Sequence, residues 1–327
     1  MEIMVTICKV LISCTVVALM GAHLAKETIA KENKDGLVIR TFDNLYEPSA
    51  VVSLPGGHFL IFEDEGGKKM ASFSLQMDDS GLLLQKIFSG GAELRVSDIE
   101  GATMGGGEQF FAVTSHSARK DGERTGEREN LLRLSLGVNN SVEIHGQANL
   151  RAPLIKELLK LDPSPADKEE GLNIEGLSFT ADKKTLMIGL RAPLVENKAV
   201  ILLLKNPYDV GKKGFVPDFS GGQLLLDLGG GGVRAMGFAA QQGLYFFVSE
   251  IENEKGKMRS RLWSWSGERK DYPMQRDLYG LKHLRNIEGL SFFTYEEKEM
   301  VLLVCDDGNK KKKQGAHYVV VPVAQLR

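Results

Sequence analysis

Cysteine is scarce in this sequence, and its scarcity limits how the chain can be stabilised. The 327 residues include three cysteines, and two of them, Cys8 and Cys14, fall inside a predicted signal segment. The mature chain would keep only Cys305, which excludes an internal disulfide. An excess of charge is also missing, because 41 basic residues stand against 43 acidic ones. This balance gives no reason to expect a nucleic-acid or membrane partner.

Two familiar motifs of catalysis and nucleotide binding are absent as well. No Gly-x-Ser-x-Gly segment occurs, so nothing supports a serine hydrolase triad. The run Gly229–Gly232 is followed neither by a Lys-Ser/Thr pair nor by a helix pattern. We interpret it as a turn and not as a phosphate-binding loop.

The amino terminus has the features of a secretory signal. Lys9 precedes an apolar run, Val10 to Met20, that is too short to span a bilayer as a mature helix. We therefore predict a signal peptide over residues 1–25, a single mature domain over residues 26–327 and a periplasmic or secreted location. A lipoprotein anchor at Cys14 and an uncleaved anchor remain as alternatives. No membrane span is expected after cleavage.

An internal repeat organises the rest of the chain. The segment Asn286 to Phe292 is nearly a copy of Asn173 to Phe179, and Asp98 to Ala102 is a looser copy. Glu47 to Val51 and Arg234 to Phe238 are weaker copies, and each copy leads into a short apolar run. Four such runs can be counted in most units. This pattern predicts an all-β fold, a β-propeller of five four-stranded blades, with six blades as the alternative.

The two ends of the chain fit a closed ring. The last unit offers only three strands, while the strand Leu37 to Phe42 belongs to no unit. We expect this N-terminal strand to complete the last blade, since closure removes exposed sheet edges. A helix is predicted at Leu154 to Leu161, inserted before the third blade.

Several segments together resemble one bacterial family. They are Asp98 to Gly101, Ser115 to Ser117, Gly171 to Leu177, Ile188 to Leu194 and Cys305 to Gly308. In this order they look like the domain of unknown function 3616 family, over roughly residues 45 to 310. The resemblance implies little about activity. More remotely, the Glu-Gly pattern is similar to periplasmic propellers of the esterase-like phytase kind.

The acidic residues that open the repeats are the candidates for function. In a propeller, the first strand of each repeat is expected to line a central channel and to pair antiparallel with the second strand. The start of the first strand and the end of the second strand then lie at the same rim of this channel. Carboxylates held close together raise one another's pKa unless a cation or donor groups intervene. Oxygen ligands with few His and no nearby Cys favour calcium over zinc. We predict a calcium site with these ligands: Asp98, Glu100, Glu175, Glu288 and Asp306.

A structural role explains the same residues. Each glutamate would accept hydrogen bonds from amides of the neighbouring blade, and the glycine after it would allow close approach of the next strand or a bulge. Met236 stands in place of the glutamate in the fourth unit, so the ring of acids is incomplete in either case. The sequence leaves both alternatives open.

Two more residues are predicted at this rim, and two hypotheses follow. His116 could act as a general base or a ligand, and Arg191 could hold a phosphate or carboxylate. In the first hypothesis, an exported monomeric propeller binds the cation together with a small anionic ligand or a protein partner. In the second, a metal-dependent phosphoesterase or esterase uses the cation to polarise its substrate, His116 to move protons and Arg191 to grip the anion. Fold alone does not decide between them.

Overall fold

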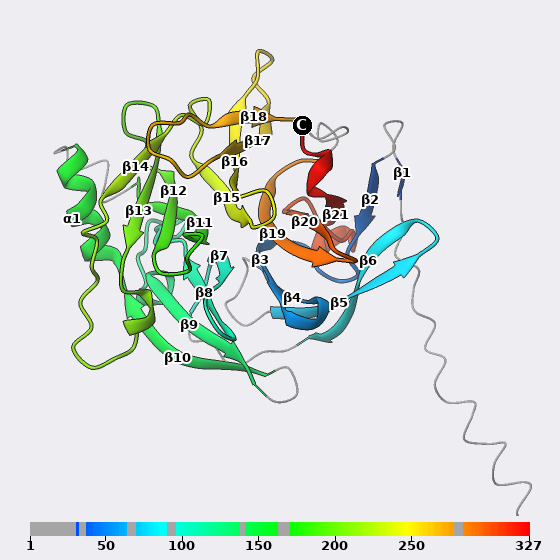
Figure 1. Cartoon of the computed structure of the whole chain (residues 1–327), viewed down its shortest axis with the longest axis horizontal. Helices are drawn as coiled ribbons and strands as arrows, with labels where there is room; N and C mark the ends of the chain where they lie inside the picture. Colours follow the sequence, from blue (N-terminus) through cyan, green and yellow to red (C-terminus); the bar gives the residue numbers. More distant parts are fainter. Residues whose placement is uncertain are drawn as a thin grey trace, which may run out of the picture.

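The computed structural model describes residues 31–32, 37–63, 70–89, 96–137, 141–162, 171–277 and 284–327. These residues form five antiparallel sheets around a common centre, with one α-helix at the periphery (Figure 1). The prediction of a five-bladed β-propeller is confirmed. The predicted signal, residues 1–25, lies outside the described residues. Among the residues described, no helix is long and apolar enough to span a bilayer.

Four of the blades are meanders whose strands follow chain order from the centre outward. Blades one and two contain β3 (Pro48–Leu54), β4 (His58–Glu63), β5 (Met70–Asp78) and β6 (Gly81–Ser89), then β7 (Ile99–Met104), β8 (Gln109–Thr114), β9 (Asn130–Leu136) and β10 (Val142–Asn149). Blades three and four contain β11 (Asn173–Phe179), β12 (Leu186–Ala192), β13 (Ala199–Leu204) and β14 (Gln223–Leu226), then β15 (Val233–Ala239), β16 (Leu244–Glu252), β17 (Met258–Trp265) and β18 (Met274–Arg276). Short 3-10 helices lie in the connections, at Pro55–Gly57, Gly126–Arg128, Pro207–Asp209, Lys310–Lys312 and Val323–Gln325.

The fifth blade combines both ends of the described chain. Its strands, from the centre outward, are β19 (Ile287–Tyr295), β20 (Lys298–Cys305), β21 (His317–Pro322), β2 (Val38–Thr41) and β1 (Lys31–Glu32). Strand β2 pairs antiparallel with β21, with Arg40 opposite Tyr318. The predicted closure by the N-terminal strand is confirmed, and β1 extends the blade by one more short strand.

Apolar packing between neighbouring blades holds the ring together. Buried side chains of the described residues form five clusters, and each cluster joins two adjacent blades. Phe110 packs toward blade one and Phe111 toward blade three, because successive residues of a strand point to opposite faces. A strand buried on both faces needs a continuous apolar run, and this need explains the runs seen in the sequence.

The helix α1 (Arg151–Leu161) covers the outer part of blade three. Leu154 and Leu158, four residues apart and therefore on one face, are fully buried in the cluster that joins blades two and three. The prediction of a helix at Leu154 to Leu161 is confirmed, although the helix begins three residues earlier. Pro153 lies in its first turn, where proline is tolerated.

Candidate functional site

Every inner strand carries a β-bulge near its start. In β7, for example, Ile99 pairs with Thr114 and Gly101 with Val113, so Glu100 has no partner in the ladder. The extra residue of a bulge is unpaired and its side chain is turned in a new direction. The equivalent residues of the five blades are Ser49, Glu100, Glu175, Arg234 and Glu288.

These registers correct the sequence alignment in two blades. Arg234, and not Met236, occupies the bulge of blade four. In blade one the equivalent residue is Ser49 and not Glu47, and the Ser49 hydroxyl donates to the Ile99 carbonyl of blade two at 2.5 Å. The alignment followed the glycine after Met236, whereas the bulge also accepts alanine in the next position. The five bulge positions therefore hold three glutamates, one arginine and one serine, and the ring of acids is interrupted in blades one and four.

The residue after the bulge is a place where adjacent blades approach closely. A Cβ on Gly176 would lie 2.5 Å from Val233 Cγ1, and a Cβ on Gly289 would lie 3.0 Å from Val51 Cγ1. Both neighbours belong to the inner strand of the next blade. These distances agree with the close-approach role that the sequence indicated for the glycines.

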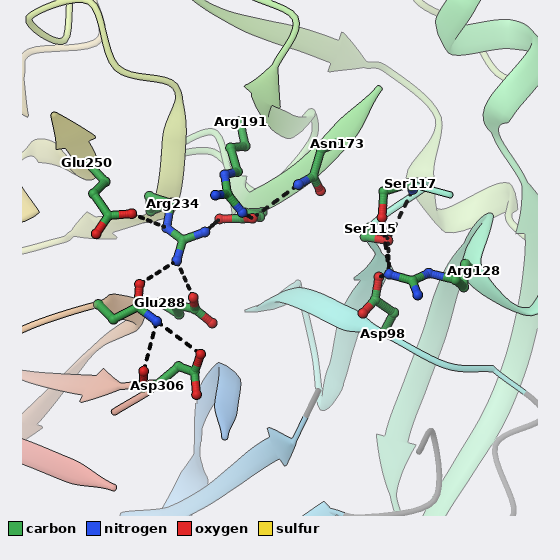
Figure 2. A network of polar contacts seen from close by, with 12 residues as sticks. Asp98, Ser115, Ser117, Arg128, Asn173, Arg191, Arg234, Glu250, Glu288 and Asp306 are labelled. Atoms are coloured by element: carbon green, nitrogen blue, oxygen red, sulfur yellow. Dashed lines mark hydrogen bonds and ion pairs between the residues drawn. The ribbon is translucent and has the colours of Figure 1, made fainter. Parts of the chain in front are cut away.

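Arg234 lies at the centre of ion pairs that join blades three, four and five (Figure 2). Its Nη1 donates to Glu175 Oε2 at 2.7 Å, and its Nη2 donates to Asn286 Oδ1 at 2.9 Å. Nη2 also donates to Glu288 Oε1. Glu250 Oε2 lies 3.9 Å from Nε, outside hydrogen-bonding distance. One buried guanidinium of blade four thus binds side chains of blades three and five.

Arg191 extends this group toward solvent. Its Nη1 donates to Glu175 Oε1 at 2.8 Å, and its side chain is 47% exposed. The side chains of Arg234 and Glu175 are only 5% and 3% exposed. We call the group the mouth cluster; its members are Glu175, Arg191, Arg234, Glu250, Asn286 and Glu288.

Acidic charge dominates the surroundings of Arg234. Burial lowers the pKa of its guanidinium, but Glu175, Glu288, Glu250 and Glu100 outweigh burial, and the net pKa is raised above the ordinary value. Arg234 is therefore charged at every physiological pH. Glu100, Glu175 and Glu288 also line a small cavity of about 10 Å³ between the inner strands.

Asp98 belongs to a different group of contacts. Its carboxylate binds Arg128 Nη2, which also donates to Ser117 Oγ at 3.1 Å. Ser115 Oγ and Ser117 Oγ are 2.9 Å apart. Figure 2 shows this group on blade two, apart from the mouth cluster. Asp98 is thus not brought together with Glu175 and Glu288.

Asp306 borders the mouth cluster and is joined to it through Asn286. Asn286 Nδ2 donates to the Asp306 carbonyl at 2.8 Å and to Asp306 Oδ2 at 3.0 Å (Figure 2). Asn286 therefore uses its oxygen for Arg234 and its amide hydrogens for Asp306. Of the five predicted ligands, Glu100, Glu175 and Glu288 share the channel, Asp306 lies beside them, and Asp98 lies apart.

His116 is fully buried, and its imidazole is neutral. Nδ1 lies 2.8 Å from the Thr114 carbonyl, an acceptor, so Nδ1 carries the proton. Burial is the main cause that lowers its pKa to about 4; Arg151 lowers it further, and the bond to Thr114 opposes the shift. Within the described residues its Nε2 has no hydrogen-bond partner. A neutral imidazole without solvent contact is poorly suited to exchange protons with a substrate in the channel.

The predicted calcium site stays a prediction. In the described part of the chain, no group of three or more His, Cys, Asp or Glu side chains is placed to hold a metal ion. Arg234 already provides positive charge between Glu175 and Glu288. A metal ion at these carboxylates would have to share them with its guanidinium.

Three members of the mouth cluster, Arg234, Glu250 and Asn286, were not among the predicted site residues, although the sequence contains a signal for each. Arg234 stands between an apolar and a small residue, as the repeat glutamates do. Asn286 precedes its Ile-Glu-Gly segment just as Asn173 does. Glu250 lies toward the end of the second strand of blade four, as Arg191 does in blade three.

Comparison with known proteins places the chain in a family. The sequence model of a family described as protein of unknown function (DUF3616) matches residues 153–322. No curated protein matches the chain.

Two solved structures are similar to the chain at low sequence identity. An exo-β-1,3-galactanase from Phanerochaete chrysosporium superimposes with a TM-score of 0.50 at 10% identity, covering 92% of this chain and 65% of the galactanase chain. The hydrazine synthase of Kuenenia stuttgartiensis gives a TM-score of 0.40 at 8% identity, covering 80% of this chain and 77% of that one. At such identity the galactanase likeness concerns the fold alone. The chain also spans less than two thirds of the galactanase.

Proposed function

Because the chain belongs to the DUF3616 family, a family described as having no known function, we propose from the site itself that the protein is a binding propeller. Its mouth cluster holds a positively charged group of a ligand. The predicted signal over residues 1–25 adds export to this proposal, so that the single domain, residues 26–327, would bind its ligand in the periplasm or the medium.

The observation that carries the proposal is the acidic excess around Arg234. Four glutamates, at positions 100, 175, 250 and 288, act on this guanidinium, and Arg191 is the second arginine in the cluster. Four carboxylates against two guanidinium groups leave two negative charges among these side chains. A concave site lined by one sign of charge attracts ions of the opposite sign.

Glu250 is the carboxylate best placed to receive the incoming cation. Its side chain is 15% exposed, and its contact with Arg234 at 3.9 Å is longer than a hydrogen bond. Turning toward a ligand would therefore cost Glu250 little. Calcium, the ion favoured by an all-oxygen ligand set, is the first candidate for this cation.

Arg191 is placed to receive an anionic group of the same ligand. A guanidinium has five N–H donors, and the contact with Glu175 uses one of them. The side chain is about half exposed. A carboxylate or phosphate that accompanies the cation could therefore bind Arg191 without displacing Glu175.

The buried position of His116 favours binding over hydrolysis. A metal-dependent esterase or phosphoesterase at this mouth needs a group that moves protons, and the histidine predicted for this role is neutral and inaccessible to solvent. The hydrolase hypothesis therefore has less support than the binding hypothesis.

Titration calorimetry with two cations tests the proposal. Calcium chloride and the diamine putrescine are titrated into the purified protein, after metal analysis and treatment with chelator. We expect at least one to bind saturably. Glu250→Gln should weaken that binding, whereas Glu252→Gln, an exposed glutamate on the same strand, should not.

The outcomes separate the versions of the proposal. Binding of calcium supports the metal prediction, and binding of putrescine alone supports an organic cation in its place. Absence of binding by both cations overturns the proposal. Turnover of 4-nitrophenyl acetate or phosphate that Glu250→Gln abolishes would favour the hydrolase instead.

A further inference from the structure

The channel opens at its other end into a second cavity of about 250 Å³. The inner strands carry their bulges on the side of the mouth cluster, and this cavity is lined by residues three to four positions further along them than the bulges. At about 3.3 Å per residue, the two regions are separated by roughly 10–13 Å. We call it the far-end cavity; its defining residues are Ser53, Thr103, Ser178, Phe238, Ser291 and Phe292.

The far-end cavity is separate from the mouth cluster. Ala102, Met236 and Leu290 line both the far-end cavity and the small cavity between the inner strands. The small cavity measures about 10 Å³, room for about one water molecule. A solute of the size of a sugar ring in the far-end cavity therefore does not fit into the small cavity that Glu100, Glu175 and Glu288 line.

Hydroxyl groups from three blades face this cavity. Thr103, Ser178 and Ser291 each stand three residues after the bulge of their own strand. Ser291 Oγ accepts the Ser53 amide at 2.9 Å, so its own hydrogen remains to be donated. Thr103 is partly buried, and its hydroxyl has no hydrogen-bond partner among the described residues. Ser178 Oγ donates to the Phe179 carbonyl at 3.3 Å and offers the cavity an acceptor only, whereas Thr103 and Ser291 can donate.

Aromatic rings form another part of the wall. Phe238, Phe292 and Phe293 line the cavity and are only partly buried. Phe292 is supported by Phe246, with ring centroids 5.4 Å apart. A partly exposed, supported ring provides a flat apolar surface on which the C–H face of a ligand can pack.

The two charged residues of the wall are already bound within the protein. Lys183 Nζ donates to the Met104 carbonyl at 2.9 Å, and loss of solvation lowers the pKa of this amine. Glu299 Oε1 accepts the Gln241 amide at 2.9 Å. One cation and one anion, each with a backbone partner, leave no net charge for an ionic ligand to match.

We propose that the far-end cavity binds a neutral, polyhydroxylated molecule of the size of one sugar ring. Its hydroxyls bond to Thr103, Ser178 and Ser291, and its apolar face packs on Phe292. The volume lies just below the usual range of sites for drug-sized ligands, which fits a single ring and not an oligomer.

Binding of D-glucose, D-galactose and myo-inositol, followed by titration calorimetry and ligand-observed NMR, tests this site. We expect at least one of the three to bind saturably. Thr103→Val keeps the shape of the side chain and removes the hydroxyl, so it should weaken binding by roughly fivefold, the loss of one neutral hydrogen bond. Phe292→Leu should weaken it as well by removing the ring.

Two controls keep the result specific. Thr125→Val makes the same change in the blade-two loop, where the threonine hydroxyl has no partner within the described residues, and should leave binding unchanged. Glu250→Gln, at the mouth cluster, should leave it unchanged too. Failure of all three probes to bind, or equal binding by the wild type and both cavity variants, would overturn the proposal, whatever the calcium and putrescine titrations show.

Discussion

At one of the five bulge positions the side chain is Arg234, whereas three of the others are glutamates. This single positive charge allows the glutamates of neighbouring blades to lie close together. Glutamates in blades two, three and five alone would repel one another in a channel of low dielectric. The guanidinium lies between Glu175 and Glu288 and satisfies both. Arg234 can therefore brace the blades while the mouth stays acidic. The carboxylate of Glu250 lies outside the hydrogen bonds of Arg234, so its negative charge remains at the mouth.

Removal of the Arg234 charge should destabilise the fold strongly. Arg234→Met would leave Glu175, whose side chain is 3% exposed, without its buried partner. Breaking a buried pair from one side costs roughly 3–5 kcal/mol. Arg191→Met removes a half-exposed arginine from the same glutamate and should cost less than about 1 kcal/mol. Urea unfolding of both variants measures the difference, and equal losses would mean that Arg234 is not the central brace.

His116 should make stability depend on pH. In the folded protein its pKa of about 4 lies below the ordinary value of 6.5. Between these two pH values the unfolded chain therefore binds a proton at His116 and the folded chain does not. The stabilisation is fully present above pH 6.5 and is lost as the pH falls from 6.5 toward 4, by on the order of 3 kcal/mol.

His116→Asn isolates this effect. Asparagine tolerates the left-handed backbone at this position, where φ is 59°, and its amide can donate to Thr114. The free energy of unfolding of the variant should fall less than that of the wild type between pH 7 and pH 4.5. His145→Asn, at an exposed histidine, should behave like the wild type. Parallel pH profiles for the wild type and His116→Asn would contradict the assignment.

At the scale of elements, the bulge explains both what the sequence predicts and what it does not. The segments Ile99 to Gly101, Ile174 to Gly176 and Ile287 to Gly289 reveal three blades directly, because glycine is needed where the next blade approaches. The other two bulges place alanine there, at Ala50 and Ala235. An alignment guided by glycine therefore shifts blade four by two residues: it places Arg234 at the rim but sets Met236, and not Arg234, opposite the repeat glutamates. Contacts that depend on such a register cannot be derived from a repeat alone.

Substitution of a bulge glycine should disturb the packing of adjacent blades. A Cβ on Gly289 would lie 3.0 Å from Val51 Cγ1 of blade one, and 2.6 Å from Val304 Cγ2 of its own blade, closer than side chains approach. We expect Gly289→Ala to cost roughly 1–3 kcal/mol, as overpacking does. Gly126→Ala, where a Cβ meets nothing within 4 Å, is the matched control. Thermal unfolding compares the two, and a neutral Gly289→Ala would show that close approach is not why glycine stands there.

At the scale of the whole molecule, the ring depends on a seam between the N-terminal strand and blade five. The sequence predicts this seam from the number of strands in each repeat. The last repeat has one strand too few, and the strand Leu37 to Phe42 belongs to no repeat. Its side-chain contacts were not predictable, because they join residues far apart in the chain. Arg40, 1% exposed, donates to Asp78 Oδ2 at 2.8 Å and to the Gly81 carbonyl at 3.1 Å. The closing strand of blade five is thereby tied to blade one.

Loss of this tie should open the seam before the rest of the ring. Arg40→Met keeps an apolar stem in the buried site and removes the bonds to Asp78 and Gly81. A loss of about 1.5 kcal/mol, the lower end of the range for hydrogen bonds of charged groups, corresponds to slightly more than tenfold faster hydrogen exchange through local opening. The amides of β2 and β21 should therefore exchange faster in the variant, while those of β12 and β13 in blade three keep their rates. Arg119→Met, which breaks an exposed pair with Glu123, should change neither set. Uniform acceleration across all blades would mean that the ring opens as one cooperative unit, and that the seam is no weaker than the interfaces between the other blades.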